Sequence, residues 1–348
     1  MWRIIGQDKA VELLQRSLDM GAVSHAYMFI GPDHSGKMTM AMDLARALNC
    51  ESREMPCGQC QSCIKVTDLK HADVQKVGIA ANDPSTDSKS KTEISIDQIR
   101  QIQHSASLPP FEGKYRVYII ENAELLSVEA ANALLKTLEE PESKVVFILL
   151  VTDSSLLLET VVSRCQPVEF VPVPSTKIME SLTTSWGIDT EKANLLARLS
   201  RGRIGWAISA TQDESLVEQR EEMLENMLDV VDADIETRFA LSTQLASKFN
   251  SDRNYVFERL NILLDLWRDM LLIKTHSIDN MINIHRLDEL TGMAEKRSLS
   301  AIRNFIRSIQ KANVELKQNA NPRLVLEVLM MDMTDTGQGS MMASLNKR

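Results

Sequence analysis

A glycine-containing loop between an apolar run and a helix constrains the fold of this chain more than any other feature. The loop reads IGPDHSGKMT from Ile30 to Thr39, and the apolar run Ala26–Ile30 leads into it. The segment from Met38 to Asn49 is rich in Ala, Met and Leu, which favours a helix. A strand, a loop with glycines and a lysine, and a helix in this order predict a phosphate-binding loop. The alternative is a turn whose glycines serve only the shape of its backbone.

The residue after the loop lysine departs from the usual pattern. In a phosphate-binding loop, backbone N–H groups and the positive end of the helix dipole face the phosphates, and Lys37 can reach the β and γ oxygens. The next residue is ordinarily Ser or Thr, whose hydroxyl binds Mg²⁺, but here it is Met38. Because a thioether is a poor ligand for a hard cation, we expect a loop that holds phosphate but places the metal badly. The candidate residues for binding ATP or ADP are Gly31, Ser35, Gly36, Lys37, Met38, Thr39, Glu121 and Thr152.

Four of the five cysteines fall close together, at Cys50, Cys57, Cys60 and Cys63. Their spacing, C-x6-C-x2-C-x2-C, suits a tetrahedral thiolate site, and the N-terminal residues carry no export signal that would favour disulfides. We therefore expect Zn²⁺ bound by all four thiolates. Because such a coordination sphere is closed, the site would be structural rather than catalytic. Unligated buried cysteines or redox cysteines are the alternative.

Strand-like and helix-like segments alternate through the first half of the chain. We expect helices at 5–22, 94–106 and 127–140, strands at 116–120 and 144–151, a further β-type run at 167–171 and a polar surface loop at 80–93. One strand ends in Glu121-Asn122, where a phosphate-loop ATPase places its metal-holding and water-activating carboxylates. Asn122 cannot accept a proton as a carboxylate does. Alternatively, Glu121 merely caps the following segment.

The alternation of strands and helices stops at Pro172 and Pro174, which predict a linker. Short helices should follow at 175–210, then uninterrupted helix from about 213 to 333, and the Gly- and Ser-containing tail should be disordered. The predicted domains are an α/β core at 1–171 with the cysteine module at 50–63, a helical lid at 172–211, a helical domain at 212–333 and a disordered tail at 334–348. The predicted fold class is therefore α/β plus all-α.

Composition narrows the class of protein. The chain has 348 residues, of which 44% are hydrophobic and 25% charged, as in ordinary globular proteins. No apolar run approaches the ~20 residues of a membrane span, and the N-terminus lacks a signal-peptide pattern, so we expect a cytoplasmic protein without a membrane partner. The net charge of −9 argues against DNA binding through a broad basic surface.

Taken together, several motifs closely resemble the bacterial clamp-loader branch of the AAA+ ATPases, over nearly the whole chain. They are HAYMFIGP at 25–32, the four-cysteine insertion, AANALLKTLEEP at 130–141, SRC at 163–165 and PRLVLEVL at 322–329. The resemblance implies a RecA-like AAA+ core, a small lid and a C-terminal collar that packs with other subunits. It also implies a hetero-pentamer with motor (gamma or tau) and delta subunits, which opens a sliding clamp and places it on primer-template DNA during replication.

Three departures from the family's motor subunits affect hydrolysis. In those subunits Thr follows the loop lysine, Asp-Glu ends the second strand, and an arginine of a sensor helix touches the γ-phosphate. The corresponding residues of this chain are Met38, Glu121-Asn122 and Gly205. The loss of a metal ligand, a water-positioning carboxylate and a charge-stabilising arginine implies little or no ATPase activity of its own. The resemblance therefore favours the family's rigid stator subunit, a part of the polymerase III holoenzyme.

The resemblance also implies a role for Arg164 in the SRC triplet. In clamp loaders this arginine reaches across a subunit interface and acts as a finger on the neighbour's ATP. The alternative is local pairing with an acid or a helix end. The neighbouring acids Glu139-Glu140, at a predicted helix end, are expected to be solvated. Two other functions remain open, an active motor subunit and a zinc-dependent nucleic-acid-binding module around Cys50–Cys63.

Overall fold

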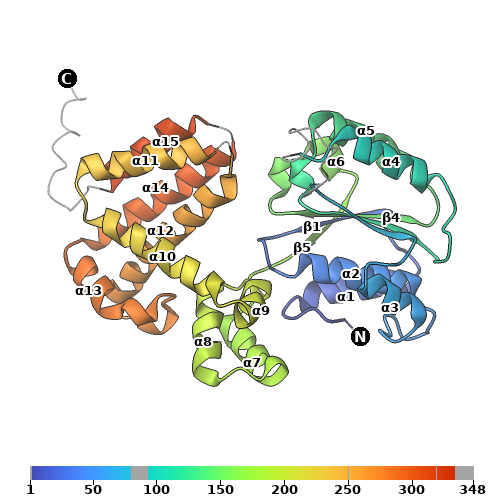
Figure 1. Ribbon diagram of the computed structural model, residues 1–348, viewed down its shortest axis with the longest axis horizontal. Helices are drawn as coiled ribbons and strands as arrows, with labels where there is room; N and C mark the ends of the chain where they lie inside the picture. The colour runs from blue at the N-terminus through green and yellow to red at the C-terminus, as the bar shows by residue number, and fades with distance from the viewer. Residues whose placement is uncertain (1, 80–92, 250, 319, 334–348) are drawn as a thin grey trace. The chain divides into compact units, whose positions relative to one another are not determined.

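The computed structural model describes residues 2–79, 93–249, 251–318 and 320–333 (Figure 1). Its contacts divide the chain into two compact units, Met1–Ile208 and Ser209–Arg348, which are described separately. The predicted polar loop, except for Glu93, and the predicted disordered tail lie outside the described residues. The division of residues 1–211 into a core and a lid stays a prediction.

The first unit is built on a parallel five-stranded sheet, whose strand order is β2-β3-β4-β1-β5. The strands are β1 (Ala26–Ile30), β2 (Val74–Val77), β3 (Arg116–Ile120), β4 (Val145–Val151) and β5 (Gln166–Glu169). Every residue of the apolar strand β4 is buried, as predicted for a central strand covered on both faces. The sequence did not predict β2, because its residues VQKV carry two exposed polar side chains and no apolar run.

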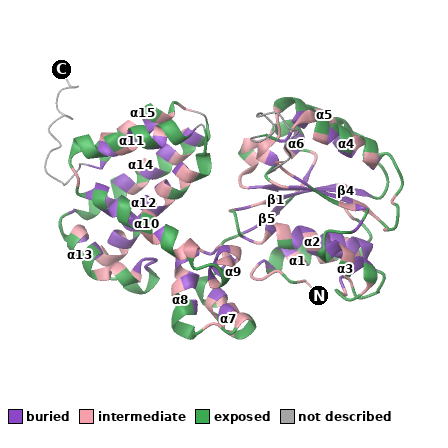
Figure 2. Ribbon diagram, in the orientation of Figure 1, coloured by how far each residue is buried: buried purple, intermediate pink, exposed green. Residues whose placement is uncertain are grey.

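Helices cover both faces of the sheet (Figure 1). On one face lie α1 (Asp8–Asp19), α2 (Lys37–Asn49) and α3 (Gln61–Thr67); on the other lie α4 (Ile96–Ala106), α5 (Val128–Glu139) and α6 (Glu159–Val162). Because side chains alternate along a strand, Tyr27 and Phe29 join the core that includes Leu44 of α2, whereas Met28 joins the core that includes Leu134 of α5. Figure 2 shows buried residues along the strands of the sheet and on the helices that cover it. The predicted α/β core is confirmed.

Local capping explains where two of the core helices begin. The Ser127 side chain accepts a hydrogen bond from the Ala130 N–H at 3.1 Å and starts α5, which ends before Pro141 as predicted. Ser95 and Gln98 form a capping box at the start of α4. The first helix is shorter than predicted, because the left-handed backbone of Gly6, with a φ of 79°, precedes its start.

Three helices follow the sheet, namely α7 (Ser175–Trp186), α8 (Thr190–Leu199) and α9 (Ile204–Gln212). Gly187 ends α7 in a left-handed conformation with a φ of 65°. Asp189 then caps α8 by accepting a hydrogen bond from the Glu191 N–H at 2.9 Å. Helix α9 begins in the first unit and ends in the second. The short helices predicted for this segment are confirmed.

The second unit is helical throughout its described residues. Its helices are α10 (Ser215–Val231), α11 (Ile235–Phe249), α12 (Arg253–Lys274), α13 (Leu287–Glu295), α14 (Leu299–Lys317) and α15 (Pro322–Asp332), with 3₁₀ turns η4 (Ile278–Asn280) and η5 (Ile284–Arg286). Trp267 of α12 and Phe305 of α14 meet edge to face in its core, with ring centroids 4.8 Å apart. The buried Asp269 carboxylate accepts hydrogen bonds from the Ile282 and Asn283 N–H groups, at 2.9 and 2.8 Å, and so fixes the chain between η4 and η5.

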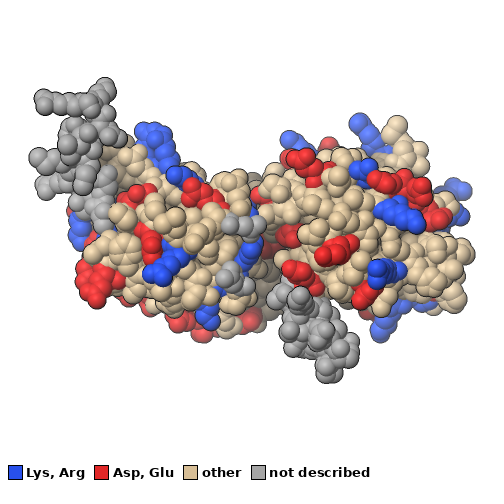
Figure 3. All heavy atoms as spheres, turned by 90° about the horizontal axis from the view of Figure 1, so that it is seen from above, with Lys and Arg blue, Asp and Glu red and all other residues tan. Residues whose placement is uncertain are grey.

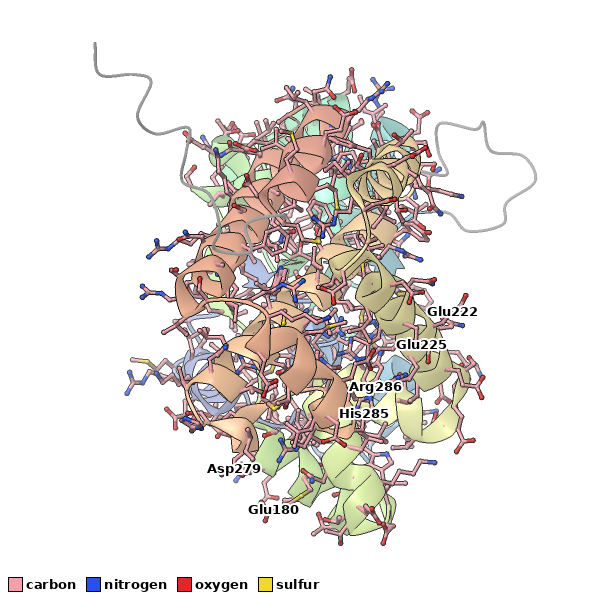
Figure 4. All side chains as sticks on the ribbon, turned by 90° about the vertical axis from the view of Figure 1, so that its left-hand side faces the viewer. Glu180, Glu222, Glu225, Asp279, His285 and Arg286 are labelled. Atoms are coloured by element: carbon pink, nitrogen blue, oxygen red, sulfur yellow. The ribbon has the colours of Figure 1, made fainter. Side chains whose placement is uncertain are left out.

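An ion-pair cluster on the same unit joins η5 to α10. Arg286 lies 2.8 Å from a Glu225 carboxylate oxygen (Figure 4). It also lies 3.5 Å from a carboxylate oxygen of Glu221. His285 Nε2 lies 3.0 Å from the other Glu221 oxygen. The His285 hydrogen bond and the Arg286 charge hold the pKa of Glu221 below its ordinary value, against the opposing effect of burial. The cluster is a structural contact between two helical segments.

Charges of both signs are interspersed on the face of the molecule shown in Figure 3. That face carries no broad basic surface among its described residues, in line with the net charge of −9. No helix in the described part of the chain is both long and apolar enough to cross a membrane.

Candidate functional site

The predicted phosphate-binding loop connects β1 to α2. Its first residue, Gly31, donates its N–H to the Val151 carbonyl at 3.1 Å, which ties the loop to the end of β4. Gly36 precedes α2 with a φ of 98°, and a Cβ atom there would lie 2.3 Å from Ile4 Cδ1. Both the left-handed backbone and the close approach of Ile4 favour glycine at this position.

The lysine of the loop is folded over the loop carbonyls. Lys37 Nζ donates to the carbonyls of Gly31 and Pro32, the second at 3.1 Å, and lies 3.8 Å from an Asp33 oxygen. Its side chain is only 10% exposed. Burial lowers the pKa of Lys37, while the negative charges of Asp33 and Glu124 oppose that shift. A desolvated ammonium group beside backbone N–H groups is suited to binding phosphate.

The hydroxyl groups around the loop do not replace a Ser or Thr after Lys37. Ser35 is 1% exposed, and its Oγ has no hydrogen-bond partner among the described residues. Met38 packs against the apolar core that contains α1 and α2, and Thr39 is exposed. Nothing in this arrangement supplies the hydroxyl ligand that a divalent cation ordinarily finds at this position.

The carboxylate predicted for this site, Glu121, pairs with a neighbouring strand. Its Oε2 lies 2.7 Å from Lys76 Nζ of β2, and both side chains are more than one-third exposed. Asn122 follows in a left-handed conformation with a φ of 51°. The geometry therefore offers Glu121 a structural partner outside the phosphate loop.

A second acid near this end of the sheet, Glu124, is one of the two carboxylates, after Asp33, whose charge acts on Lys37. It lies in the 3₁₀ turn η2 (Ala123–Leu125) after β3. Glu124 Oε1 accepts hydrogen bonds from Thr152 N at 3.1 Å and Thr152 Oγ1 at 2.7 Å, while Oε2 is buried without a partner in the part of the chain that is described. Thr152 was among the predicted site residues and Glu124 was not, although an acid two residues beyond Asn122 was a signal for it.

The segment predicted to form a lid contacts the phosphate loop at Gly205, the position expected to lack the sensor arginine. The Gly205 N–H donates to the His34 carbonyl at 2.8 Å. A Cβ atom at Gly205 would lie 2.9 Å from that carbonyl oxygen, which is too close without a backbone shift. Glycine therefore allows α9 to lie against the loop, and a larger residue would separate them.

The four predicted cysteine ligands come together between α2 and α3. All four Sγ atoms lie within 4.8 Å of one another, and Cys57 Sγ lies 4.0 Å from Cys63 Sγ. A tetrahedral zinc site with Zn–S distances of about 2.3 Å places its sulfurs roughly 3.8 Å apart. Backbone N–H groups of Cys57, Cys60 and Cys63 donate to the sulfurs of Cys50, Cys57 and Cys60, at 3.5, 3.3 and 3.4 Å. The donor set and its geometry fit a tetrahedral metal ion.

Two of these thiols have shifted pKa values. Backbone N–H groups of Gln59 and Cys60 lower the pKa of Cys57 to about 6. Burial raises the pKa of Cys63 to about 12. A bound cation would favour the thiolate form of all four residues. Cys165 is buried and stands outside the cluster.

Arg164 lies at the amino-terminal end of the parallel strands, whereas the phosphate loop lies at their carboxyl end. It follows α6 and comes two residues before β5. The first residue of β5, Gln166, is the register partner of Tyr27 in β1. The loop begins at Gly31, four residues further along β1, or about 13 Å at 3.3 Å per residue. Arg164 Nη1 donates to the Thr160 carbonyl at 2.8 Å, and Nη2 lies 2.7 Å from Glu139 Oε1. Arg164 thus has local partners, and from this end of the sheet it cannot contact a phosphate in the loop of its own chain.

Comparisons with known proteins agree with this architecture. A family model described as "DNA polymerase III, delta subunit" matches residues 6–174. The tau subunit of DNA polymerase III from Bacillus subtilis is 29% identical over 364 residues, which cover 97% of this chain and 62% of that subunit. The delta-prime subunit of the same organism is 26% identical over 329 residues, which cover 93% of this chain and 95% of that subunit.

Other relatives are matched over a smaller part. The tau subunit from Escherichia coli is 33% identical over 215 residues, or 60% of this chain and 32% of that subunit. This chain therefore spans less than two-thirds of the length of these tau subunits. A solved structure of RuvB from Thermotoga maritima is 16% identical, with a TM-score of 0.40, and the match covers 70% of this chain and 76% of that chain. A structure of a DNA polymerase III gamma subunit-related protein from the same organism is 19% identical, with a TM-score of 0.36, and the match covers 92% of this chain and 98% of that chain.

The sequence relationships are supported by features described above that do not depend on them: the parallel sheet, the phosphate loop and the cluster of four cysteines. We conclude that the chain belongs to the clamp-loader subunits of DNA polymerase III, a branch of the AAA+ ATPases.

Proposed function

We propose that this chain is a delta-prime-type stator subunit, which supports ATP-driven loading of a sliding clamp and supplies Arg164 to a neighbouring ATPase subunit. The match over 95% of a delta-prime subunit supports this assignment more directly than the match over 62% of a tau subunit. The proposed partners are motor (gamma or tau) and delta subunits in a hetero-pentamer, with the sliding clamp and primer-template DNA contacted through the complex.

The observation that carries the proposal is the position of Arg164. Its side chain is 35% exposed and lies at the amino-terminal end of the strands, opposite its own phosphate loop. A planar guanidinium can neutralise charge that develops on a transferred γ-phosphate, but only where it reaches that phosphate. Because Arg164 is remote from its own loop, the phosphate it could serve belongs to an adjacent subunit.

The chemistry of the chain's own loop supports the same division of roles. Met38 offers no metal ligand, Asn122 offers no carboxylate, and Gly205 offers no guanidinium. Each of these groups stabilises the transition state of phosphoryl transfer, and the loss of one typically costs orders of magnitude in rate. We therefore infer little or no hydrolysis by this chain alone, with ATP or ADP as the nucleotide that Lys37 would hold.

Zinc is the metal proposed for Cys50, Cys57, Cys60 and Cys63, because four clustered thiolates favour it. With four protein ligands the ion would hold α2 and α3 together and take no part in chemistry. A lid at 172–211 and a collar at 212–333 complete the proposed domain arrangement.

The test is a reconstituted loader that contains the motor and delta subunits and this chain. Arg164→Ala should lower ATP turnover by at least about tenfold, while assembly measured by size-exclusion chromatography stays intact. Arg100→Ala is a matched control, because Arg100 is an exposed arginine of the same unit whose ion pair, in the part of the chain that is described, is with the nearby Asp97. Unchanged turnover with Arg164→Ala would remove the finger role.

A motor subunit is the second candidate function, because a tau subunit matches 97% of this chain. A motor would hydrolyse ATP steadily as an isolated chain and lose that activity on Lys37→Ala. The stator proposal expects the isolated chain to show no hydrolysis that depends on Lys37.

A further inference from the structure

We infer that Glu124, held in place by Thr152, is the metal-binding carboxylate of the phosphate-loop site and makes nucleotide binding depend on a divalent cation. The inference concerns nucleotide binding by this chain and goes beyond the proposed stator role, which needs no bound nucleotide here. Glu124 would then fill a position that the family pattern assigns to the residue at 121.

The first observation is how Glu124 is held. Both the N–H and the hydroxyl of Thr152 bond to the same carboxylate oxygen, Oε1, at 3.1 and 2.7 Å. Thr152 directly follows β4, and the preceding residue, Val151, accepts the N–H of Gly31 at the start of the phosphate loop. Glu124 follows β3, two strands from β1, but its carboxylate is held at the end of β4, the strand next to β1 and the loop. Ligands of such parallel sheets bind at this carboxyl end of the strands.

The second observation is what remains unpaired. Glu124 Oε2 is buried without a hydrogen-bond partner among the described residues, and so is Ser35 Oγ within the loop. Ser35 is 1% exposed, so water does not satisfy its hydroxyl from bulk solvent. Buried polar atoms almost always have a partner. One such atom lies in the phosphate loop and the other on an acid whose charge acts on Lys37, and together they indicate a polar ligand that the described residues do not supply.

The charges around the loop indicate which ligand would bind there. Burial lowers the pKa of Lys37, and the negative charges of Asp33 and then of Glu124 oppose that shift, so the Glu124 carboxylate acts on the Lys37 ammonium group. The same charge repels the phosphates that Lys37 would attract, and at short range in a partly buried site such repulsion is large. A divalent cation between carboxylate and phosphate converts this repulsion into attraction. Mg²⁺ is commonly bound by one or two carboxylates together with phosphate oxygens and water.

The other candidate carboxylate at the end of β3, that of Glu121, already has an ion-pair partner. Glu121 forms its ion pair with Lys76 at 2.7 Å, where both side chains are exposed to solvent. Met38 cannot serve as a ligand for a hard cation. Among the acids at the end of β3, Glu124 is the one that combines an unpaired oxygen with an electrostatic effect on Lys37.

The experiment measures binding of ADP to the full chain by isothermal titration calorimetry, with and without added Mg²⁺. Magnesium is removed by passing the buffer over a resin before the protein is added, because a strong chelator in the sample would also compete for a metal at the cysteines. For the unaltered chain we expect binding at least about tenfold tighter with Mg²⁺. Glu124→Gln keeps the shape and an acceptor for Thr152, and it should bind ADP about equally well with and without Mg²⁺.

Further variants separate ligation from structure. Glu121→Gln should keep the Mg²⁺ dependence of the unaltered chain. Thr152→Val removes the hydroxyl that positions Glu124 and should reduce the dependence, and Thr152→Ser should restore it. Thermal unfolding of each variant establishes that it is folded.

Three outcomes would overturn the inference: no binding of ADP by the unaltered chain, binding that ignores Mg²⁺, or a Mg²⁺ dependence that disappears with Glu121→Gln and survives Glu124→Gln. None of them bears on Arg164 in the reconstituted loader, so the stator proposal fails or succeeds separately.

Discussion

The guanidinium of Arg164 lies 2.7 Å from the carboxylate of Glu139, an acid 25 residues earlier in the chain at the end of α5. The side chains are 35% and 50% exposed. An ion pair this open to solvent contributes between about 0 and 1 kcal/mol. The pair therefore orients Arg164 at the surface without fixing it, and a stronger anion on a neighbouring subunit could replace Glu139.

This relationship predicts different results for the two partners. Glu139→Gln should change the free energy of unfolding by less than about 1 kcal/mol and leave the ATP turnover of the reconstituted loader close to that of the unaltered complex. Arg164→Ala should have an equally small effect on unfolding but a large effect on turnover. Urea unfolding and a steady-state phosphate-release assay measure the two effects. Equal losses of turnover from both substitutions would mean that the pair itself, and not a free guanidinium, is what the loader needs.

The four-cysteine cluster predicts one zinc ion per chain, measured by atomic emission on the purified protein. Cys63→Ala should lose the metal and lower the thermal midpoint, because three thiolates leave the tetrahedral site open. Cys165→Ala is the matched control. Cys165 is also buried, and burial raises its pKa to about 12, but no other thiol lies with it. Absence of zinc from the unaltered chain, or equal zinc content in Cys63→Ala, would contradict the prediction.

Acid should weaken the first unit through Asp73. Its carboxylate accepts N–H groups of Phe111, Glu112 and Gly113, at 2.7, 2.8 and 2.7 Å, and lies 3.1 Å from Arg116. Burial opposes ionisation, but these donors outweigh it and lower the pKa of Asp73 from its ordinary value. The stabilisation is complete above the unfolded-state pKa of about 3.9 and is lost as the pH falls through the lower folded-state pKa.

Asp73→Asn should therefore lower the free energy of unfolding by about 2–4 kcal/mol at pH 7, because an amide cannot accept hydrogen bonds from four donors as a carboxylate does. The cost should shrink below about pH 4, where the unaltered chain loses the same stabilisation. Urea unfolding between pH 7 and pH 2.5 measures both. The exposed Asp68→Asn is the control and should change little at any pH. A cost for Asp73→Asn that stays constant down to pH 2.5 would assign the effect to packing instead of charge.

The sequence predicted the framework of the first unit well, because its signals are local. Apolar runs gave β1, β3 and β4, and Ser127 with Pro141 bounded α5. Short polar β2 left no such signal. Its edge position and the pairing of Lys76 with Glu121 became visible only with the sheet assembled.

The contacts of the candidate site were harder to predict, since they join segments that are distant in sequence. Glu139 and Glu140 are exposed, as expected, and the structure shows that Glu139 is the acid in the local pairing that was the alternative for Arg164. Glu124 likewise depends on Thr152, which is 28 residues away. The cysteine ligands were predictable because their spacing alone brings them together.

The contact between Gly205 and His34 predicts that an arginine cannot simply be restored at position 205. The helix α9 lies against the loop with a hydrogen bond of 2.8 Å, and a Cβ atom would approach the His34 carbonyl oxygen to 2.9 Å. Gly205→Ala should therefore destabilise the first unit by about 1–3 kcal/mol, the usual range for overpacking. Gly205→Arg should lower the stability of the first unit by at least as much, because the arginine side chain would have to displace α9 from the loop.

Gly292→Ala in α13 provides the matched control, since nothing lies within 4 Å of a Cβ atom there and the backbone is helical. It should stabilise the second unit by about 0.5–1 kcal/mol. Gly205→Arg should also fail to create ATP hydrolysis in the isolated chain, because Met38 and Asn122 still leave the metal and the attacking water without their usual ligands. Thermal unfolding and phosphate release measure the two effects, and a stable Gly205→Arg chain that hydrolyses ATP would show that the missing arginine alone had kept the site inactive.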